Sequence, residues 1–135
     1  MRRLLVLPVL AVALAIAVAA GAENKDAKAA KAAPKSTTLK GELVDMGCYV
    51  SHEARGEKHK GCAMKCVAGG MPIGLLTADN KLYLLTPNHD NADPYNMAKE
   101  LMSAMVEVTG TVSERGGARI LDVTEVKASA TAVTK

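Results

Sequence analysis

The chain has 135 residues, of which 49% are hydrophobic and 2% aromatic, with no Phe and no Trp. Its formal net charge is +3, but two basic residues, Arg2 and Arg3, lie in an apolar leader, so the rest of the chain is nearly neutral. Such a chain has no strong field for attracting nucleic acid or anionic lipid, and it has few rings on which bases could stack. We therefore expect neither nucleic acid nor a membrane as a partner of the processed chain.

Residues 1–22 have the layout of a secretory signal peptide. A short basic head precedes an uncharged run from Leu4 to Ala20, and small residues precede Glu23, as at a signal-peptide cleavage site. The apolar run is also about as long as the shortest segments that span a bilayer, which leaves a membrane anchor as the alternative. Because a charged, Ala-rich tract follows at once, we predict cleavage after Ala22 and a periplasmic or secreted protein.

The residues after the leader divide into a linker, one domain and a tail. Residues 23–38 are rich in Ala and Lys and contain no large apolar residue. Such a segment buries too little surface to offset its ordering entropy, so it is predicted to be a flexible linker. Residues 128–135 are predicted to be a disordered tail. Residues 39–127 remain as one small domain near the lower size limit for a self-sufficient core.

The first half of this domain contains three predicted strands. Residues 38–46 have strand-forming residues at both ends and predict a first strand that stops at Gly47. Two apolar runs follow later, IGLLT (73–77) and KLYLLT (81–86), and the residues ADN separate them. They predict a hairpin whose turn holds Asn80 in a left-handed conformation.

A helix is predicted to follow this hairpin. Asp93 and Pro94 indicate its start, because Asp can cap free N–H groups and Pro suits the first helical position. The apolar residues that come next recur at the i, i+3, i+4, i+7 spacing of one buried stripe. These residues are Ala98, Leu101, Met102 and Met105.

Two more strands are predicted at the end of the domain. Residues 106–114 and 118–126 flank the sequence RGG and predict a second hairpin with glycines in the turn. Three valines alternate with polar residues as in a half-buried strand, namely Val106, Val108 and Val112. Gly110 indicates a bulge or a sharp bend.

Taken in order, these elements are five short strands, with a Cys/His segment after the first strand and a helix between the third and the fourth. This order resembles the OB-fold, a five-stranded Greek-key barrel, over residues 38–127. The predicted fold class is therefore mainly β with helices. The stretch CAMKCVAGGMPIGLLTADNKLYLLT (62–86) also resembles a group of small secreted bacterial domains without an assigned activity. Neither resemblance implies a catalytic residue.

The segment HKGCAMKC, residues 59–66, concentrates potential metal ligands. If residues 57–67 are helical, as the glycine pair that follows them indicates, then His59, Cys62 and Cys66 stand about one turn apart on a single face. The sequence therefore predicts that one imidazole and two thiols point in the same direction.

A metal site results if Cys48, the remaining thiol, meets this helix face. Two or three thiolates with one or two imidazoles form a soft, roughly tetrahedral set of ligands that suits Zn or Cu(I). His52 is the alternative imidazole, while Met64 and Met71 offer thioethers that favour copper. The predicted ligands are Cys48, His52, His59, Cys62 and Cys66.

Other interpretations of the cysteines stay open. A disulfide between Cys48 and Cys62 or Cys66 would stabilise a small exported domain by ~2–4 kcal/mol and leave one thiol over. Thiol redox chemistry is a further alternative, because nearby lysines would lower a thiol pKa, although the C-x-x-C motif of thioredoxin-like enzymes is absent. A buried apolar stripe would account for the same spacing.

The sequence contains no recognisable catalytic constellation. No pair of groups has the spacing expected for acid–base or nucleophilic catalysis. We therefore predict a binding domain and not an enzyme, with a metal ion or an unidentified protein as its partner.

Overall fold

The computed structural model describes residues 35–129, so the predicted leader, residues 1–22, lies outside the described part, as do residues 130–135 of the predicted tail. Ala128, assigned to that tail, pairs with Val106 and belongs to a strand. The elements in chain order are β1 (Ser36–Asp45), α1 (Met46–His52), the 3₁₀ helix η1 (Glu57–His59), α2 (Lys60–Ala68), β2 (Ile73–Thr77), β3 (Leu82–Pro87), α3 (Asp93–Glu100), β4 (Met105–Arg115) and β5 (Ala118–Ala128). The predicted order of strands and helices is confirmed, and α1 is an additional helix. Among the described helices, none combines the length and the apolar character that crossing a membrane requires.

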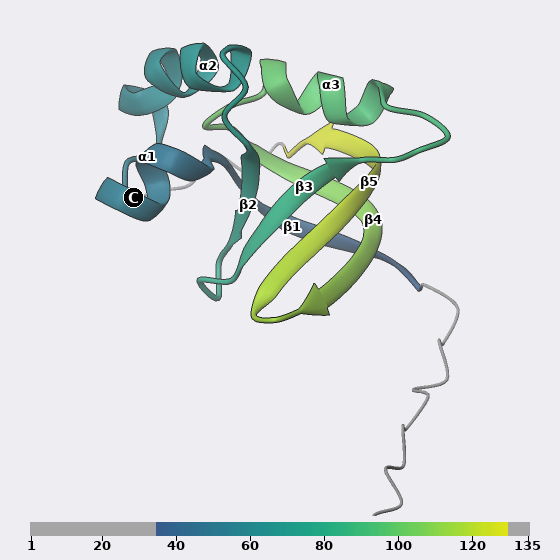
Figure 1. The fold of residues 1–135 in the computed structure, drawn as a ribbon. Helices are drawn as coiled ribbons and strands as arrows, with labels where there is room; N and C mark the ends of the chain where they lie inside the picture. The colour runs from purple at the N-terminus through teal and green to yellow at the C-terminus, as the bar shows by residue number, and fades with distance from the viewer. Residues whose placement is uncertain (1–34, 130–135) are drawn as a thin grey trace, which may run out of the picture. The chain divides into compact units, whose positions relative to one another are not determined.

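The strands close into a mixed barrel in the order β1-β2-β3-β5-β4 (Figure 1). β1 is antiparallel to both β2 and β4, so it takes part in two ladders. β3 and β5 run parallel, with Leu85 opposite Leu121, and this ladder completes the barrel. The OB-like, mainly β architecture that the sequence predicts is therefore confirmed.

β1 begins earlier than the sequence analysis predicts. Ser36 is its first residue and pairs with Thr111 of β4. Thr38 lies in the same ladder, where its hydroxyl oxygen is 2.8 Å from that of Thr109. The last residues assigned to the linker therefore belong to the barrel, because they pair with the long strand β4, while residues 23–34 lie outside the described part.

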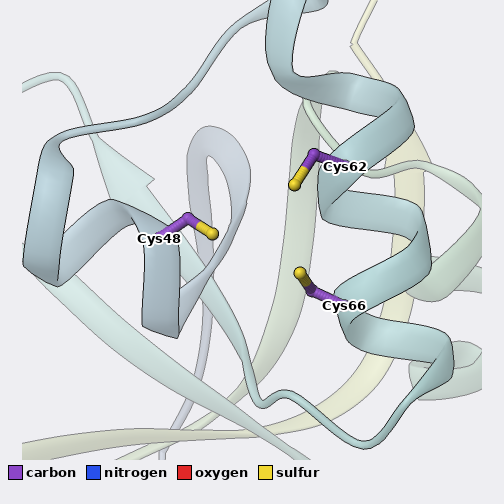
Figure 2. Close-up of side chains that lie close together, drawn as sticks. All are labelled: Cys48, Cys62 and Cys66. Atoms are coloured by element: carbon purple, nitrogen blue, oxygen red, sulfur yellow. The ribbon is translucent and has the colours of Figure 1, made fainter.

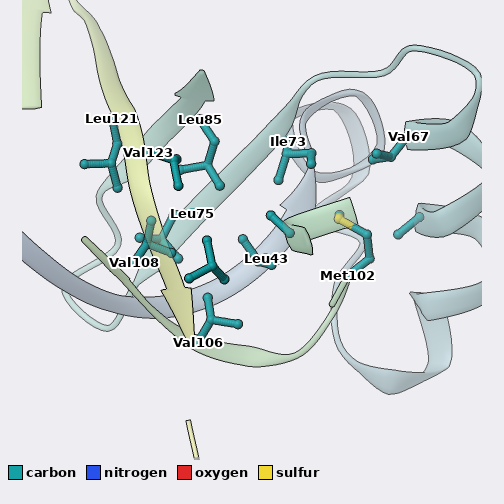
Figure 3. Packing of buried hydrophobic residues seen from close by; sticks show 13 residues of the cluster. Leu43, Val67, Ile73, Leu75, Leu85, Met102, Val106, Val108, Leu121 and Val123 are labelled. Carbon is teal, nitrogen blue, oxygen red and sulfur yellow. The ribbon is translucent and has the colours of Figure 1, made fainter. Parts of the chain in front are cut away.

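Aliphatic side chains from all five strands fill the barrel (Figure 3). The strand residues of this core cluster are Leu43, Ile73, Leu75, Leu85, Val106, Val108, Leu121, Val123 and Val126. Helices α2 and α3 lie side by side over one end of the barrel (Figure 1) and add Ala63, Val67 and Ala98 to the same core. This covered end of the barrel also positions the cysteines.

The hairpin of β4 and β5 follows the prediction except at one residue. Gly116 and Gly117 form its turn with positive φ angles, and the register shifts between Thr109 and Gly110 as expected for a bulge. The prediction that Val112 lies on a buried face is wrong, because its side chain is 37% exposed. Beyond the bulge β4 extends past the core, and its last residues are exposed.

Helix α3 begins where the sequence predicts, but its N-cap is Ala92, which supplies no side-chain cap. Asp93 is its first residue, so its side chain does not cap the helix. The side-chain oxygen of Asn91 instead accepts a hydrogen bond from the N–H of Asp93, at 2.9 Å. The helix also ends at Glu100, so only Ala98 of the predicted stripe is helical. Leu101 and Met102 lie in the turn that follows, and Met105 begins β4.

The turn between α3 and β4 contains a strained residue. Ser103 has a φ of 62°, and its buried hydroxyl has no hydrogen-bond partner among residues 35–129. Its N–H donates to the carbonyl of Leu43, at 2.8 Å, which ties the turn to β1.

We expect Ser103→Gly to raise the free energy of unfolding by about 0.5–1 kcal/mol. Glycine takes a positive φ without strain, and the variant leaves no hydroxyl unpaired. Urea denaturation measures the change. Ser103→Ala removes the hydroxyl but keeps the backbone strain, so it should gain less. A loss of stability in the glycine variant would contradict this account of the turn.

Candidate metal centre

All three cysteines of the chain lie in the connection between β1 and β2. Cys48 belongs to α1, whereas Cys62 and Cys66 stand one turn apart on α2. In Figure 2 the Cys48 side chain points from α1 toward α2, and the side chains of Cys62 and Cys66 point toward the space between the two helices. Cys48 therefore meets the helix face that carries the other two thiols, as the sequence predicts.

The three sulfur atoms lie within 4.8 Å of one another. Thiolates bound tetrahedrally at the usual Zn–S distance of about 2.3 Å are separated by ~3.8 Å. Each sulfur–sulfur separation therefore needs to shorten by no more than about 1 Å for all three to bind one ion. All three cysteines are free thiols in the structure, so neither of the alternative disulfides is formed.

A second group of potential ligands shares Cys48 with the first. The ligand atoms of Asp45, Cys48 and His59 also lie within 4.8 Å of one another. The Asp45 carboxyl group is fully buried, and one of its oxygens is 2.9 Å from Nε2 of His59. Its other oxygen accepts a hydrogen bond from the backbone N–H of Cys48, at 2.8 Å.

Asp45 is the functional residue that sequence reasoning missed. The sequence analysis placed it inside the first strand, whereas it is the last residue of β1 and the N-cap of α1. An Asp side chain that accepts from the N–H three residues later is a usual N-cap. The sequence pattern that could have indicated this role is an Asp three residues before Cys48. Gly47, which lies between them, suggested the end of a strand instead of the start of a helix.

The electrostatics of the site keep Asp45 ionised and two thiols protonated when no cation is bound. Burial raises the pKa of Asp45, but hydrogen bonds from the Cys48 N–H and from His59 outweigh it, and the pKa falls below its ordinary value. Burial and the Asp45 carboxylate together raise the pKa of Cys48 to about 12. Burial and the neighbouring Cys62 raise the pKa of Cys66. A metal ion must therefore displace protons from this site in order to bind.

The local packing explains why α1 can approach α2. A Cβ atom on Gly47 would lie 2.7 Å from the sulfur of Met71, so any larger residue here would push that side chain aside. The N–H of Met71 donates to the carbonyl of Cys66, at 2.9 Å. The N–H of Met46 donates to the carbonyl of Pro72, also at 2.9 Å, which joins the start of α1 to the residue before β2.

Helix α2 separates its core residues from its thiols. Ala63 and Val67 are buried against the barrel, whereas Cys62 is exposed and Cys66 is partly exposed. Both pairs have the same four-residue spacing, but they occupy adjacent faces of the helix. The interpretation of these cysteines as part of a buried apolar stripe is therefore wrong for Cys62.

The two predicted imidazoles have different surroundings. His59 lies just before α2, at its N-cap, and joins the cluster through Cys48 and Asp45. His52 is the exposed last residue of α1 and belongs to neither group of ligand atoms. A metal-binding role for His52 stays a prediction that this arrangement does not support.

The fold and the site together define a small OB-like barrel with a three-thiol cluster next to one covered end. No protein-family model matches the chain, and no curated protein matches it. The function must therefore be argued from the geometry and chemistry of the site.

Proposed function

We propose that the protein is an exported binding domain that holds a soft metal ion, zinc or copper(I), at Cys48, Cys62 and Cys66. The observation that carries this proposal is the approach of three free thiols to within 4.8 Å of one another. Sulfur ligands from cysteine select zinc and copper(I) over harder ions such as magnesium and calcium. Export rests on the leader sequence of residues 1–22 and gives a periplasmic or secreted location.

The arrangement supports metal binding better than the two other interpretations of the cysteines. A disulfide would use two of the sulfurs and leave the third beside them without a partner. A thiol redox protein needs a cysteine that ionises readily, whereas the pKa of Cys48 is raised to about 12 and that of Cys66 is also raised. A cation accounts for all three thiols, because it replaces their protons.

Metal titration of the reduced, metal-free protein tests this function. We expect native mass spectrometry to show one bound ion per chain after addition of zinc or copper(I), and the melting temperature to rise because the ion binds only the folded site. The thiols of the loaded protein should react with a thiol reagent only after a chelator is added. Failure to retain either ion, with thiols that react equally fast in its presence, would refute the proposal.

A further inference from the structure

We infer that the ion held at this site is copper(I), bound by the three thiolates in a trigonal arrangement. This inference rests on the proposed metal-binding function and narrows it to one ion. It follows from how many ligands the cluster offers, from what the neighbouring polar groups already bind, and from the thioether of Met71, which packs on the glycine before Cys48.

The first argument is the number of ligands. Among the described residues, the group that contains all three sulfurs includes no His, Asp or Glu. Structural zinc sites are almost always four-coordinate, with all four ligands supplied by the protein. Copper(I) carries one positive charge where Zn²⁺ carries two, so three thiolates satisfy it without a fourth ligand. Soft sulfur ligands also favour copper(I) among the first-row metals.

The second argument is that the nearest harder ligands are already engaged. Both carboxylate oxygens of Asp45 accept hydrogen bonds, one from the Cys48 N–H and one from His59. His59 in turn uses Nε2 for this contact. These two residues therefore fix the backbone of Cys48 and act as positioning residues, in the way that second-shell groups orient metal ligands.

The third argument is the presence of another soft sulfur. The thioether of Met71 packs against Gly47, the residue that precedes Cys48, and its backbone is hydrogen-bonded to Cys66. Thioethers are soft ligands that suit copper(I). A soft sulfur atom therefore lies next to the residue that precedes Cys48 in α1.

Competition between the two ions tests the inference. The reduced, metal-free protein is loaded with zinc and then titrated without oxygen with copper(I), supplied as its acetonitrile complex, and zinc release is followed with a coloured chelator. We expect one equivalent of copper(I) to release all bound zinc. X-ray absorption of the product should show three sulfur neighbours and no nitrogen.

The possible outcomes separate this inference from the proposed function. If zinc stays bound in the presence of an equal amount of copper(I), or if copper(I) acquires a nitrogen ligand, the inference is overturned while the metal site stands. If the protein binds neither ion, both fail. Full zinc release with sulfur-only coordination supports both.

Variants of the positioning residues provide a second readout. We expect Asp45→Asn and His59→Gln to lower the affinity for copper(I) by about 10–100-fold, as loss of second-shell contacts usually does, while three sulfur neighbours remain. His52→Gln is the matched control, because His52 is exposed and outside both groups, and its affinity should be unchanged. If Asp45→Asn fails to fold, His59→Gln carries the test. Loss of a metal–nitrogen signal in His59→Gln would show that His59 is a ligand and overturn the inference.

Discussion

The Cys48→Ser variant is expected to lose metal affinity by more than the ~10–100-fold that removal of a supporting residue causes. A serine hydroxyl is a hard ligand that stays protonated at neutral pH. The remaining thiols, Cys62 and Cys66, lie on one helix and bind the ion from one side only. Cys62→Ser should have the same effect. Because Cys62 is exposed, its loss should leave the barrel intact, which circular dichroism can verify. Competition with a chelator of known affinity measures the change.

A matched control for these variants is available on α1. Val50 is 65% exposed and lies close to Cys48 in the same helix. Val50→Ser introduces the same hydroxyl without removing a thiol, so its affinity should equal that of the unchanged protein. If Cys48→Ser and Cys62→Ser both bound the ion as tightly as this control, the metal would have to be held elsewhere.

The Gly110→Ala variant is expected to lower the free energy of unfolding by about 3 kcal/mol or more, at the upper end of the range for overpacked cores. A Cβ atom at Gly110 would overlap the backbone carbonyl of Asp122 and press on the side chain of Leu121, at 3.1 Å. A backbone group cannot rotate away, so the bulge of β4 and the closed barrel must deform. Urea denaturation followed by circular dichroism measures the loss.

Gly61→Ala is the control for this prediction. Gly61 lies in α2, and a Cβ atom there would meet nothing within 4 Å. Alanine favours a helix over glycine, so this variant should gain up to about 1 kcal/mol. Stabilities that do not differ between Gly110→Ala and Gly61→Ala would contradict the close approach of β4 and β5 at the bulge.

The barrel could be predicted from sequence because its elements carry strong local signals. The glycine pair between β4 and β5 takes the positive φ angles of a tight turn, and Gly110 marks a bulge. The burial of Val112 could not be judged in this way, since alternation says nothing about where a strand extends past the core. The sequence analysis did not predict the parallel ladder of β3 and β5, because no local pattern encodes a pairing across a helix.

The sequence predicted the metal-binding residue types of the candidate site, but not the helix α1 and the Asp45 side chain that position Cys48. The spacing of Cys62 and Cys66 placed both thiols on one helix face, because helical geometry fixes that relation. Helix α1 was not predicted, since Gly47 indicated the end of a strand and not the first turn of a helix. Met71, which packs on this glycine, is far from it in sequence. Asp45 was missed for the same reason, because its hydrogen bond from the Cys48 N–H requires the start of α1. Its contact with His59 depends on the fold and has no local signal.

The placement of every thiol between two neighbouring paired strands has a kinetic consequence. The pairing of Asp45 with Ile73 joins the two ends of the connection that holds the cluster, so the contacts that build it are short in sequence. The ladder of β1 with β4, where Ser36 meets Thr111, joins residues much farther apart. Contacts with low sequence separation form sooner during folding. The three cysteines can therefore come together before β1 pairs with β4. A metal ion bound at that stage would hold β1 and β2 in place while the other strands add to the sheet.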